Sequence, residues 1–370
     1  MKYNWQQKDW TNFSYDTKRL EEYIYEFSEK VGHSKGVLSV LTKGQHTQTL
    51  IDVLVSEAIK TSEIEGEFIS RKDVLSSVKK NIGVSNDTVA IRDVRAKGIA
   101  EMVVEVHKTY KKPLTETFLY DWHKMLFSKK TNINVGQWRA HTEPMQIVSG
   151  SAGKEIIHFE APPSINIPNE MLGFIKWFND TAPGGKHAIK FAPIRAGIAH
   201  LYFESLHPFE DGNGRIGRAI AEKALLQTLG YPLLLSLSTT LEKNRNVYYA
   251  SLKSAQTGNE ITNWLVFFIA IILSSLETSE ILINFTLKKA RLFDIYKNQI
   301  NERQEKVIRK ILDSGLDGYI GGMTAKKYMQ ITQVSKSTAT REMQQLRDLN
   351  IFQTIGQGRS TSYVINLNDI

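Results

Sequence analysis

Apolar side chains recur every three or four positions over most of the chain, which is the spacing of one face of an α-helix. The pattern is clear in residues 50–64, 92–110 and 116–127, where it predicts amphipathic helices. Gly66 follows Glu65 directly after the first of these stretches, at a position where helices commonly end on a left-handed residue. The sequence therefore predicts a mainly α-helical protein.

The helical pattern stops between about residues 138 and 168. Residues 145–150 and 156–163 are two short β-prone runs with glycines between them, which predicts a β-hairpin. The two prolines that end the second run cannot continue a β-ladder. A hairpin is therefore expected among the helices.

The C-terminal residues 301–370 have a pattern of their own, which predicts a separate domain. Three helical patterns are followed by two β-prone runs with glycines between them: 302–312, 324–330, 336–349, then 351–355 and 361–365. Three helices followed by a hairpin is the element order of a winged helix-turn-helix.

Composition narrows the choice of chemistry. The 370 residues can bury a sizeable core in more than one domain, and the absence of cysteine excludes disulfides, thiolate metal sites and cysteine nucleophiles. A net charge of +8 suits an anionic ligand, but it gives no support for nucleic-acid binding by itself. The first residues lack the apolar stretch of a secretory signal, so we expect a cytoplasmic protein. The apolar run 264–276 is too short to cross a hydrocarbon layer of roughly 30 Å, and we expect a buried helix and no membrane partner.

Residues 207–218, HPFEDGNGRIGR, combine groups that suit phosphate chemistry. His207 is a titratable side chain directly after an apolar helix pattern. Gly212 and Gly214 let the main chain come close to a ligand and take up positive φ. Backbone N–H groups in such a turn, and at the start of the helix behind it, form a cavity suited to an anion.

Charged side chains of the same motif fit that anion. Arg215 and Arg218 are three residues apart, so both guanidinium groups can face it. Asp211 lies at the edge of the turn, where its carboxylate could join phosphate oxygens and water around Mg²⁺. A plain turn between two helices would explain the glycines and Asn213, but not a histidine and two arginines at the same turn.

This motif resembles the signature of the Fic family, HPFx[D/E]GNGRxxR, at every specified position. The resemblance covers most of the chain. The expected architecture of the chain is similar to that of two-domain bacterial Fic proteins. It implies a helical bundle with a β-hairpin flap and a reaction that moves AMP from ATP to a Ser, Thr or Tyr hydroxyl of a protein, including the chain itself. The expected domains are an N-terminal helical region with an inhibitory motif at 1–90, a Fic catalytic core at 91–275, a linking helix at 276–300 and a winged helix-turn-helix at 301–370.

The resemblance also implies a role for each motif residue. His207 would be the general base that deprotonates the target hydroxyl, since an unperturbed histidine titrates near pH ~6.5. Asp211 would hold Mg²⁺ against the α- and β-phosphates, Arg218 would take the γ-phosphate, and Phe209 would anchor the turn in the core. The nucleotide would be bound by Gly212, Asn213, Gly214, Arg215, Ile216, Gly217, Arg218, Tyr248 and Gln256. Gln256 stands where the family often has asparagine.

Two further segments resemble parts of the family. Val148, Ser149 and Gly150 resemble the flap, which pairs with the target as an added strand, although a plain surface hairpin explains the same pattern. Residues 61–66, TSEIEG, resemble the inhibitory motif [S/T]xxxE[G/N] of the class with an N-terminal inhibitory helix.

The inhibitory motif has a direct physical reading. A Glu65 carboxylate paired with Arg218 would occupy the guanidinium that the γ-phosphate needs, and the α-phosphorus would then be poorly aligned for attack. The alternative is that Glu63, Glu65 and Glu67 form a solvated acidic cluster at a helix end.

Other functions remain open at this point. One is a hydrolase that removes AMP at the same site, with Glu65 positioning a water molecule. Another is a DNA-binding regulator, in which residues 335–341 begin a recognition helix. Residues 301–370 contain ten Lys or Arg and seven Asp or Glu, a net charge of +3 that is small for a DNA-binding domain, and winged domains also bind proteins. The resemblance further suggests a homodimer.

Overall fold

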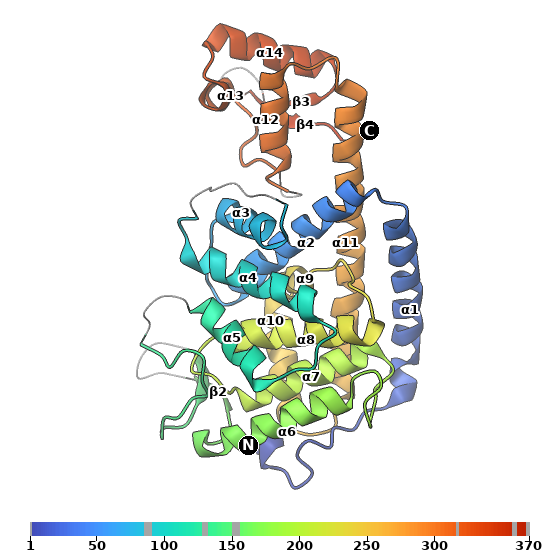
Figure 1. The fold of residues 1–370 in the computed structure, drawn as a ribbon, viewed down its shortest axis with the longest axis vertical. Coiled ribbons are helices and arrows are strands. Elements are labelled where there is room, and N and C mark those ends of the chain that lie inside the picture. The colour runs from blue at the N-terminus through green and yellow to red at the C-terminus, as the bar shows by residue number, and fades with distance from the viewer. Residues whose placement is uncertain are drawn as a thin grey trace. The chain divides into compact units, whose positions relative to one another are not determined.

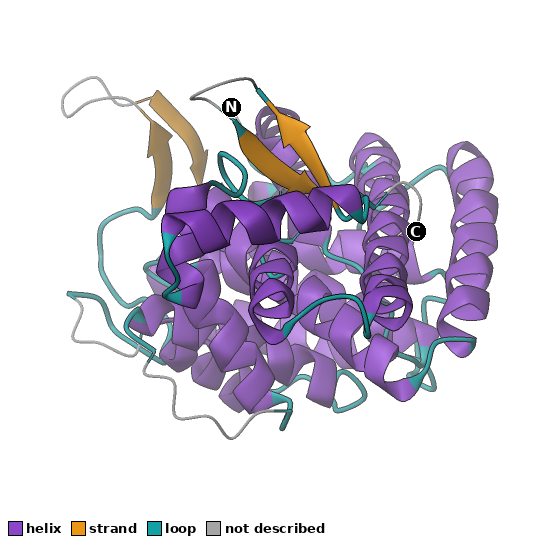
Figure 2. Ribbon diagram, turned by 90° about the horizontal axis from the view of Figure 1, so that it is seen from above, coloured by secondary structure: helices purple, strands orange, loops and turns teal. Residues whose placement is uncertain are grey.

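The computed structural model describes residues 2–84, 91–127, 132–149, 156–315, 318–356 and 361–367 (Figure 1). These residues are mainly α-helical, and their strands form two antiparallel two-stranded sheets (Figure 2). The mainly α fold class predicted from the sequence is therefore confirmed. The chain divides into two compact units: Met1–Val40 with Val53–Ser279, called unit 1, and Leu41–Asp52 with Glu280–Ile370, called unit 2.

Unit 1 holds most of the helices, two of which continue into unit 2. The short 3₁₀ helices are η1 (Asn4–Gln6) and η2 (Ser164–Asn166). The α-helices are α1 (Thr17–Ser39), α2 (Lys43–Ile64), α3 (Arg71–Asn81), α4 (Val94–Thr109), α5 (Glu116–Leu126), α6 (Ile167–Asp180), α7 (Ala192–Leu206), α8 (Asn213–Leu229), α9 (Leu237–Lys243), α10 (Arg245–Ala255) and α11 (Thr262–Tyr296). Of these, α2 begins in unit 2 and α11 ends there.

Helix α7 is the centre of unit 1. Every one of its residues is buried, which is the expected position of a helix that is apolar on all sides. Its main partner is α8, and the start of α11 also packs against it, where Trp264 Nε1 donates to Gly197 O at 2.9 Å. A Cβ atom at Gly197 would lie 2.8 Å from Leu265 Cδ2, so glycine is needed for this close approach.

Helix α11 joins two segments that the sequence analysis treated separately, the apolar run 264–276 and the linking helix expected at 276–300. The apolar run 264–276 is its first part, and the helix continues without a break through the expected boundary between residues 275 and 276. Within the described residues it is long and apolar enough to span a membrane, yet 56% of its 18-residue apolar window is buried inside the protein. A core helix of this kind meets the same criteria of length and hydropathy, so the helix gives only weak support for a membrane span.

The predicted hairpin among the helices is present. Strands β1 (Gln146–Ser149) and β2 (Ile156–Glu160) pair antiparallel, with a register shift between Ile147 and Val148. Gly150, one of the three predicted flap residues, lies outside the described residues.

Residues 302–365 of unit 2 form three helices followed by a hairpin, in the order that the sequence predicted. The elements are α12 (Glu302–Leu312), α13 (Ala325–Thr332), α14 (Lys336–Asp348), β3 (Phe352–Ile355) and β4 (Ser362–Ile365). Backbone bonds join Met323 to Tyr363, so the segment before α13 adds a bridge to β4. An apolar core that includes Ile308, Tyr328 and Leu346 holds the three helices together. The assignment of this unit as a winged helix-turn-helix remains a prediction.

Candidate active site

The motif of residues 207–218 forms a tight turn between α7 and α8. His207 takes a left-handed conformation (φ 46°) that ends α7, and Gly212 takes a second one (φ 82°) directly before α8. Asn213 fixes the turn, because its Oδ1 accepts from Phe209 N at 2.9 Å and its Nδ2 donates to Phe209 O at 2.8 Å. The side chain of Asn213 is therefore engaged by the protein, and only its backbone is available to a ligand.

Phe209 anchors this turn in the core, as predicted. Its fully buried ring stacks on His123 with the ring centroids 4.2 Å apart. His123 Nδ1 accepts from Gly136 N at 2.9 Å, so Nε2 carries the proton and donates to Asp211 O at 3.2 Å. Burial lowers the pKa of His123 to about 4, which keeps the ring in this neutral form.

His207 is held as a neutral imidazole. Burial and the nearby Arg139 guanidinium lower the pKa of His207 to about 4, so at pH 7 the ring can accept a proton. Arg139 also fixes the backbone of the turn. Its side-chain Nε donates to His207 O at 2.8 Å, and its backbone N–H donates to Pro208 O at 2.9 Å. Nothing near Arg139 in the sequence indicated this contact, which joins residues far apart along the chain.

Glu204 is a second buried group beside His207. Its Oε2 lies 3.7 Å from His207 Nδ1, and burial raises the pKa of Glu204 to about 8, so the carboxyl is protonated at pH 7. A Cβ atom at Gly217 would lie 2.2 Å from Glu204 Oε1, so Gly217 makes room for this carboxyl against α8. Gln256 Nε2 donates to the main-chain oxygen of Glu204 at 3.3 Å. Glu204 was missed because it lies in the apolar pattern of α7.

Glu65 pairs with Arg218, as the inhibitory motif predicted. The Arg218 Nη2 and Glu65 Oε1 atoms are 2.8 Å apart, and the Arg218 side chain is almost completely buried. Thr61 holds the same guanidinium, with its Oγ1 accepting from Nε at 2.7 Å and its main-chain oxygen accepting from Nη2 at 2.8 Å. Gly66 takes φ 78° directly after Glu65, so the chain turns away from the helix axis just beyond the carboxylate.

A second carboxylate of the same segment pairs with the other motif arginine. Arg215 Nη1 lies 2.9 Å from Glu67 Oε2, and the Arg215 side chain is 4% exposed. Arg215 Nη2 also lies 3.6 Å from Asp211 Oδ1. The sequence placed Glu67 only in an acidic cluster, and the pair with Arg215 was not predicted because the two residues are 148 positions apart along the chain.

Glu65 lies over the first turn of α8. A Cβ atom at Gly214 would meet Glu65 Oε1 at 2.2 Å and Arg218 Nη1 at 3.1 Å, so only glycine allows this approach. In the described part of the chain the N–H groups of Asn213 and Gly214 have no acceptor, whereas Gly212 N donates to Asp211 Oδ1 at 2.5 Å. The start of α8 therefore offers two free amides at the position expected of an anion site.

A cavity of about 790 Å³ brings six of the predicted site residues together. Its lining includes Glu65, Val148, His207, Gly214, Tyr248 and Gln256 from the sequence prediction. It also includes Glu204, Arg245, Tyr249, Lys253 and His158, which the sequence did not indicate. Segments that are distant in the sequence therefore meet at one concave site, which is the usual form of a small-molecule site.

Tyr248, Ile216 and Val148 differ in how far their side chains are exposed. Tyr248 is buried, and its hydroxyl lies 2.8 Å from Nε2 of the buried His200, so its ring is held rigidly at the cavity wall. Ile216 is fully buried in α8, so its side chain serves the core. Val148 is 48% exposed on β1, next to Ser149 at the end of the same strand.

Asp211 is the residue that fits a metal ligand. Its side chain is 58% exposed, and its Oδ2 has no partner within the described residues. These residues contain no cluster of three or more His, Cys, Asp or Glu side chains that could hold a metal by itself. One exposed carboxylate fits Mg²⁺, which usually takes one or two carboxylates and completes its shell with phosphate oxygens and water.

Comparison with known families agrees with this geometry. Residues 113–225 match the model of the Fic/DOC family, so the chain contains a Fic domain, as the motif predicted. Residues 3–84 match a separate model, described as a domain of unknown function (DUF4172). Glu65 and Glu67 belong to this second segment, whereas Arg215 and Arg218 belong to the Fic domain.

Individual relatives match over limited lengths. A probable protein adenylyltransferase of Aquifex aeolicus is 30% identical over 102 residues, which are 27% of this chain and 27% of that protein. The protein adenylyltransferase Fic of Aedes aegypti is 20% identical over 251 residues, covering 67% of this chain and 40% of its own length. The chain therefore covers well under two thirds of these relatives.

A solved structure supports the fold over a longer range. The crystal structure of a Fic family protein from Desulfovibrio desulfuricans covers 93% of this chain and 96% of its own, with a TM-score of 0.52 and 17% identity. At this identity the similarity establishes the fold alone.

Proposed function

We propose that this chain is an autoinhibited protein adenylyltransferase, which transfers AMP from ATP to a Ser, Thr or Tyr hydroxyl of a protein. The observation that carries the proposal is the neutral imidazole of His207 in the same cavity as Gly214, at the free amides that begin α8. A proton acceptor beside a phosphate-sized anion site is the arrangement that phosphoryl chemistry on a hydroxyl needs. Relatives named protein adenylyltransferases support the same reaction.

The reaction can be written on this chain's own groups. His207 takes the proton of the target hydroxyl, and the hydroxyl oxygen forms a bond to the α-phosphorus of ATP. The bond from that phosphorus to the oxygen bridging to the β-phosphate breaks, and pyrophosphate leaves. The low pKa of His207 makes it a weak base, so its contribution depends on holding the hydroxyl in line with the phosphorus.

The phosphates are held by the start of α8 in this proposal. The N–H groups of Asn213 and Gly214 bind phosphate oxygens, and Arg215 and Arg218 bind the remaining negative charge. Mg²⁺ bound by Asp211 would supply positive charge against the leaving pyrophosphate. The adenine fits the part of the cavity beside Tyr248 and Gln256, which lies on the α10 side of the site.

Two carboxylates oppose this binding. Glu65 occupies Arg218 and Glu67 occupies Arg215, so both guanidinium groups are already paired before a nucleotide arrives. A γ-phosphate that reaches Arg218 must displace the Glu65 carboxylate, because Glu65 Oε1 lies 2.8 Å from Arg218 Nη2. The same carboxylate covers Gly214, since a Cβ atom there would lie 2.2 Å from Glu65 Oε1. We therefore propose that release of this segment switches the enzyme on.

The hairpin is proposed to receive the target. Val148 lines the cavity from β1, and Ile157, its partner on β2, is also 48% exposed. A two-stranded sheet leaves an outer edge on each strand, so an extended target segment can add to it as a third strand. This would bring the target hydroxyl to the His207 side of the cavity.

Mass spectrometry of the full chain after incubation with Mg²⁺ and ATP tests the proposal. We expect slow gain of one or more adenylyl groups, and no gain in His207→Ala, which should still bind ATP because the amides of α8 remain. Release of AMP from a previously modified protein, with no transfer from ATP, would instead identify a hydrolase. No transfer by the Glu65→Gly variant after prolonged incubation with candidate proteins would refute the transferase.

A further inference from the structure

Unit 2 carries a surface that the proposed reaction does not use. Helices α13 and α14 are joined by a three-residue turn at 333–335, in which Gln333 takes a left-handed conformation (φ 57°). Ser335 caps α14, because its Oγ accepts from Thr338 N at 3.3 Å. A short second helix, a tight turn and a longer third helix form the arrangement in which DNA-binding proteins present a recognition helix.

One side of α14 holds the helix in place. Ala339, Met343 and Leu346 are buried in the apolar core of unit 2. The other side is exposed and carries Ser337, Arg341 and Gln344 at positions i, i+4 and i+7, which is one continuous stripe on a helix. No apolar side chain belongs to this stripe, so it is not suited to pack into a protein core.

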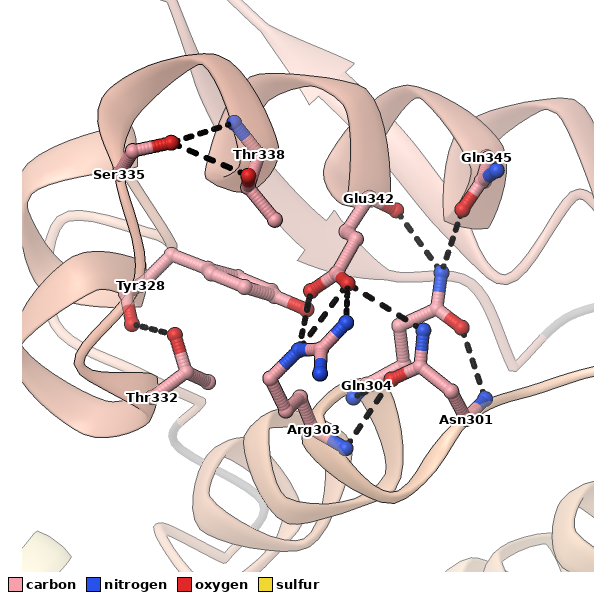
Figure 3. Close-up of polar contacts among 9 residues, drawn as sticks. All are labelled: Asn301, Arg303, Gln304, Tyr328, Thr332, Ser335, Thr338, Glu342 and Gln345. Atoms are coloured by element: carbon pink, nitrogen blue, oxygen red, sulfur yellow. Dashed lines mark hydrogen bonds and ion pairs between the residues drawn. The ribbon is translucent and has the colours of Figure 1, made fainter.

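The carboxylate of α14 nearest to this stripe, that of Glu342, is buried, and its negative charge is paired within unit 2. Glu342 is 2% exposed, and Tyr328 donates to its Oε2 at 2.7 Å while Arg303 pairs with its Oε1 (Figure 3). Burial raises the pKa of Glu342, but the bonds from Arg303 and Tyr328 lower it by more, so the group is ionised and fully paired. Figure 3 shows Asn301 and Gln304 of the α12 start completing the same network.

The exposed charge that remains on α13 and most of α14 is positive. Lys326, Lys336 and Arg341 are exposed, and within the described residues none of them forms an ion pair. The exposed acid of α14, Asp348, lies at the far end of the helix and is paired with Arg347. The Arg303–Glu342 pair removes one charge of each sign, so the net charge of residues 301–370 stays at +3, and Lys326, Lys336 and Arg341 are left exposed and unpaired within the described residues.

We propose that unit 2 binds duplex DNA, with α14 in the major groove. Lys326 and Lys336 contact phosphates, whereas Arg341 and Gln344 face base edges. Arginine pairs well with guanine, and glutamine with adenine, through two hydrogen bonds each. A protein partner with an acidic surface would satisfy the cations alone, but it would not use a stripe of hydrogen-bonding groups spaced along a helix.

Titration of the full chain with fluorescently labelled random-sequence duplex DNA, at several salt concentrations, tests this proposal. We expect binding that weakens steeply with salt. A Lys326→Ala/Lys336→Ala variant, which removes both proposed phosphate contacts, should bind at least about tenfold more weakly, with a salt slope lower in magnitude by about 2. The matched control is Lys297→Ala/Lys310→Ala, which removes the same charge from exposed positions of unit 2 outside α13 and α14. Thermal unfolding of each variant shows whether unit 2 remains folded.

A second variant separates base reading from charge. Gln344→Ala keeps the net charge, so the salt slope should stay unchanged while the sequences selected from a random duplex pool change at one position. Equal loss in the control pair, tighter binding to single-stranded RNA than to the duplex, or no duplex binding at low salt would each overturn the proposal. The DNA titration does not depend on adenylyl transfer, so either proposal can fail without the other.

Discussion

Replacement of Glu65 by glycine is the most direct test of the brake. The substitution removes the carboxylate that lies 2.8 Å from Arg218 Nη2, whereas Thr61 still holds the same guanidinium through two hydrogen bonds. Arg218 should therefore keep its position and become available to the γ-phosphate. The variant should transfer AMP faster than the wild-type chain.

The size of the effect follows from the strength of one contact. The Glu65 side chain is 30% exposed, so water screens the pair and the energy of a fully buried ion pair does not apply. A hydrogen bond to a charged group contributes about 1.5 to 3 kcal/mol, and each 1.4 kcal/mol is a factor of ten in an equilibrium. Loss of Glu65 should therefore raise the initial rate of transfer by roughly 10- to 100-fold.

The assay is the initial rate of adenylyl incorporation, measured by intact mass at several ATP concentrations. Glu63→Gly is the matched control, because Glu63 lies on the same helical turn but pairs with Lys60 at 2.6 Å. It removes one acid and adds one glycine without touching Arg218. Equal rates for the two variants would show that the effect comes from a weakened helix end, and the reasoning on the ion pair would then be wrong.

Three further predictions concern side chains and glycines of unit 1. Glu67→Gln should release Arg215 and raise the transfer rate by less than Glu65→Gly does, because Glu65 still blocks Arg218. The double variant Glu65→Gly/Glu67→Gln should transfer AMP faster than either single variant in the same mass assay. The folded pKa of His207 is about 4, below the unfolded value of about 6.5, so His207 should lower the free energy of unfolding as pH falls between these values. Glu204, with a pKa of about 8, acts in the opposite direction, so the effect of His207 is the difference between the wild-type chain and His207→Gln. Urea unfolding of both from pH 7.5 to 4.5 measures this difference, and parallel profiles would contradict the prediction. Gly98→Ala should destabilise unit 1 by about 1 to 3 kcal/mol, because the added Cβ would lie 1.9 Å from Met125 O. Gly32→Ala in α1 should instead stabilise unit 1 by roughly 0.5 to 1 kcal/mol, because an added Cβ would have nothing within 4 Å. Thermal unfolding of both variants measures the two effects.

The parts of the site that the sequence predicted are those encoded in short contiguous segments. Residues 207–218 supply a base, two arginines and an anion-binding turn, and their chemistry can be inferred without tertiary structure. Glu65 was predicted from a short motif, and the geometry with Arg218 agrees with that prediction. The helix patterns and both hairpins were also predicted, because each depends on local periodicity and turn residues.

The missed groups act through contacts between distant segments. Arg139 reaches His207 O across 68 positions of sequence, and no local pattern marks such a contact. Glu204 looks like one polar residue in an apolar helix until α8 is placed against it with Gly217 at the contact. The linking helix was predicted, but its continuity with the apolar run before it was missed, because the apolar pattern ends near residue 276 while the helix continues to Tyr296.

The two hydrogen bonds between the Asn213 side chain and the Phe209 backbone have a thermodynamic consequence. They set the shape of the turn before any anion arrives, so little conformational entropy is left to lose when a phosphate docks on the amides behind it. Calorimetric titration with a nucleotide should then show no large entropic penalty from ordering this loop.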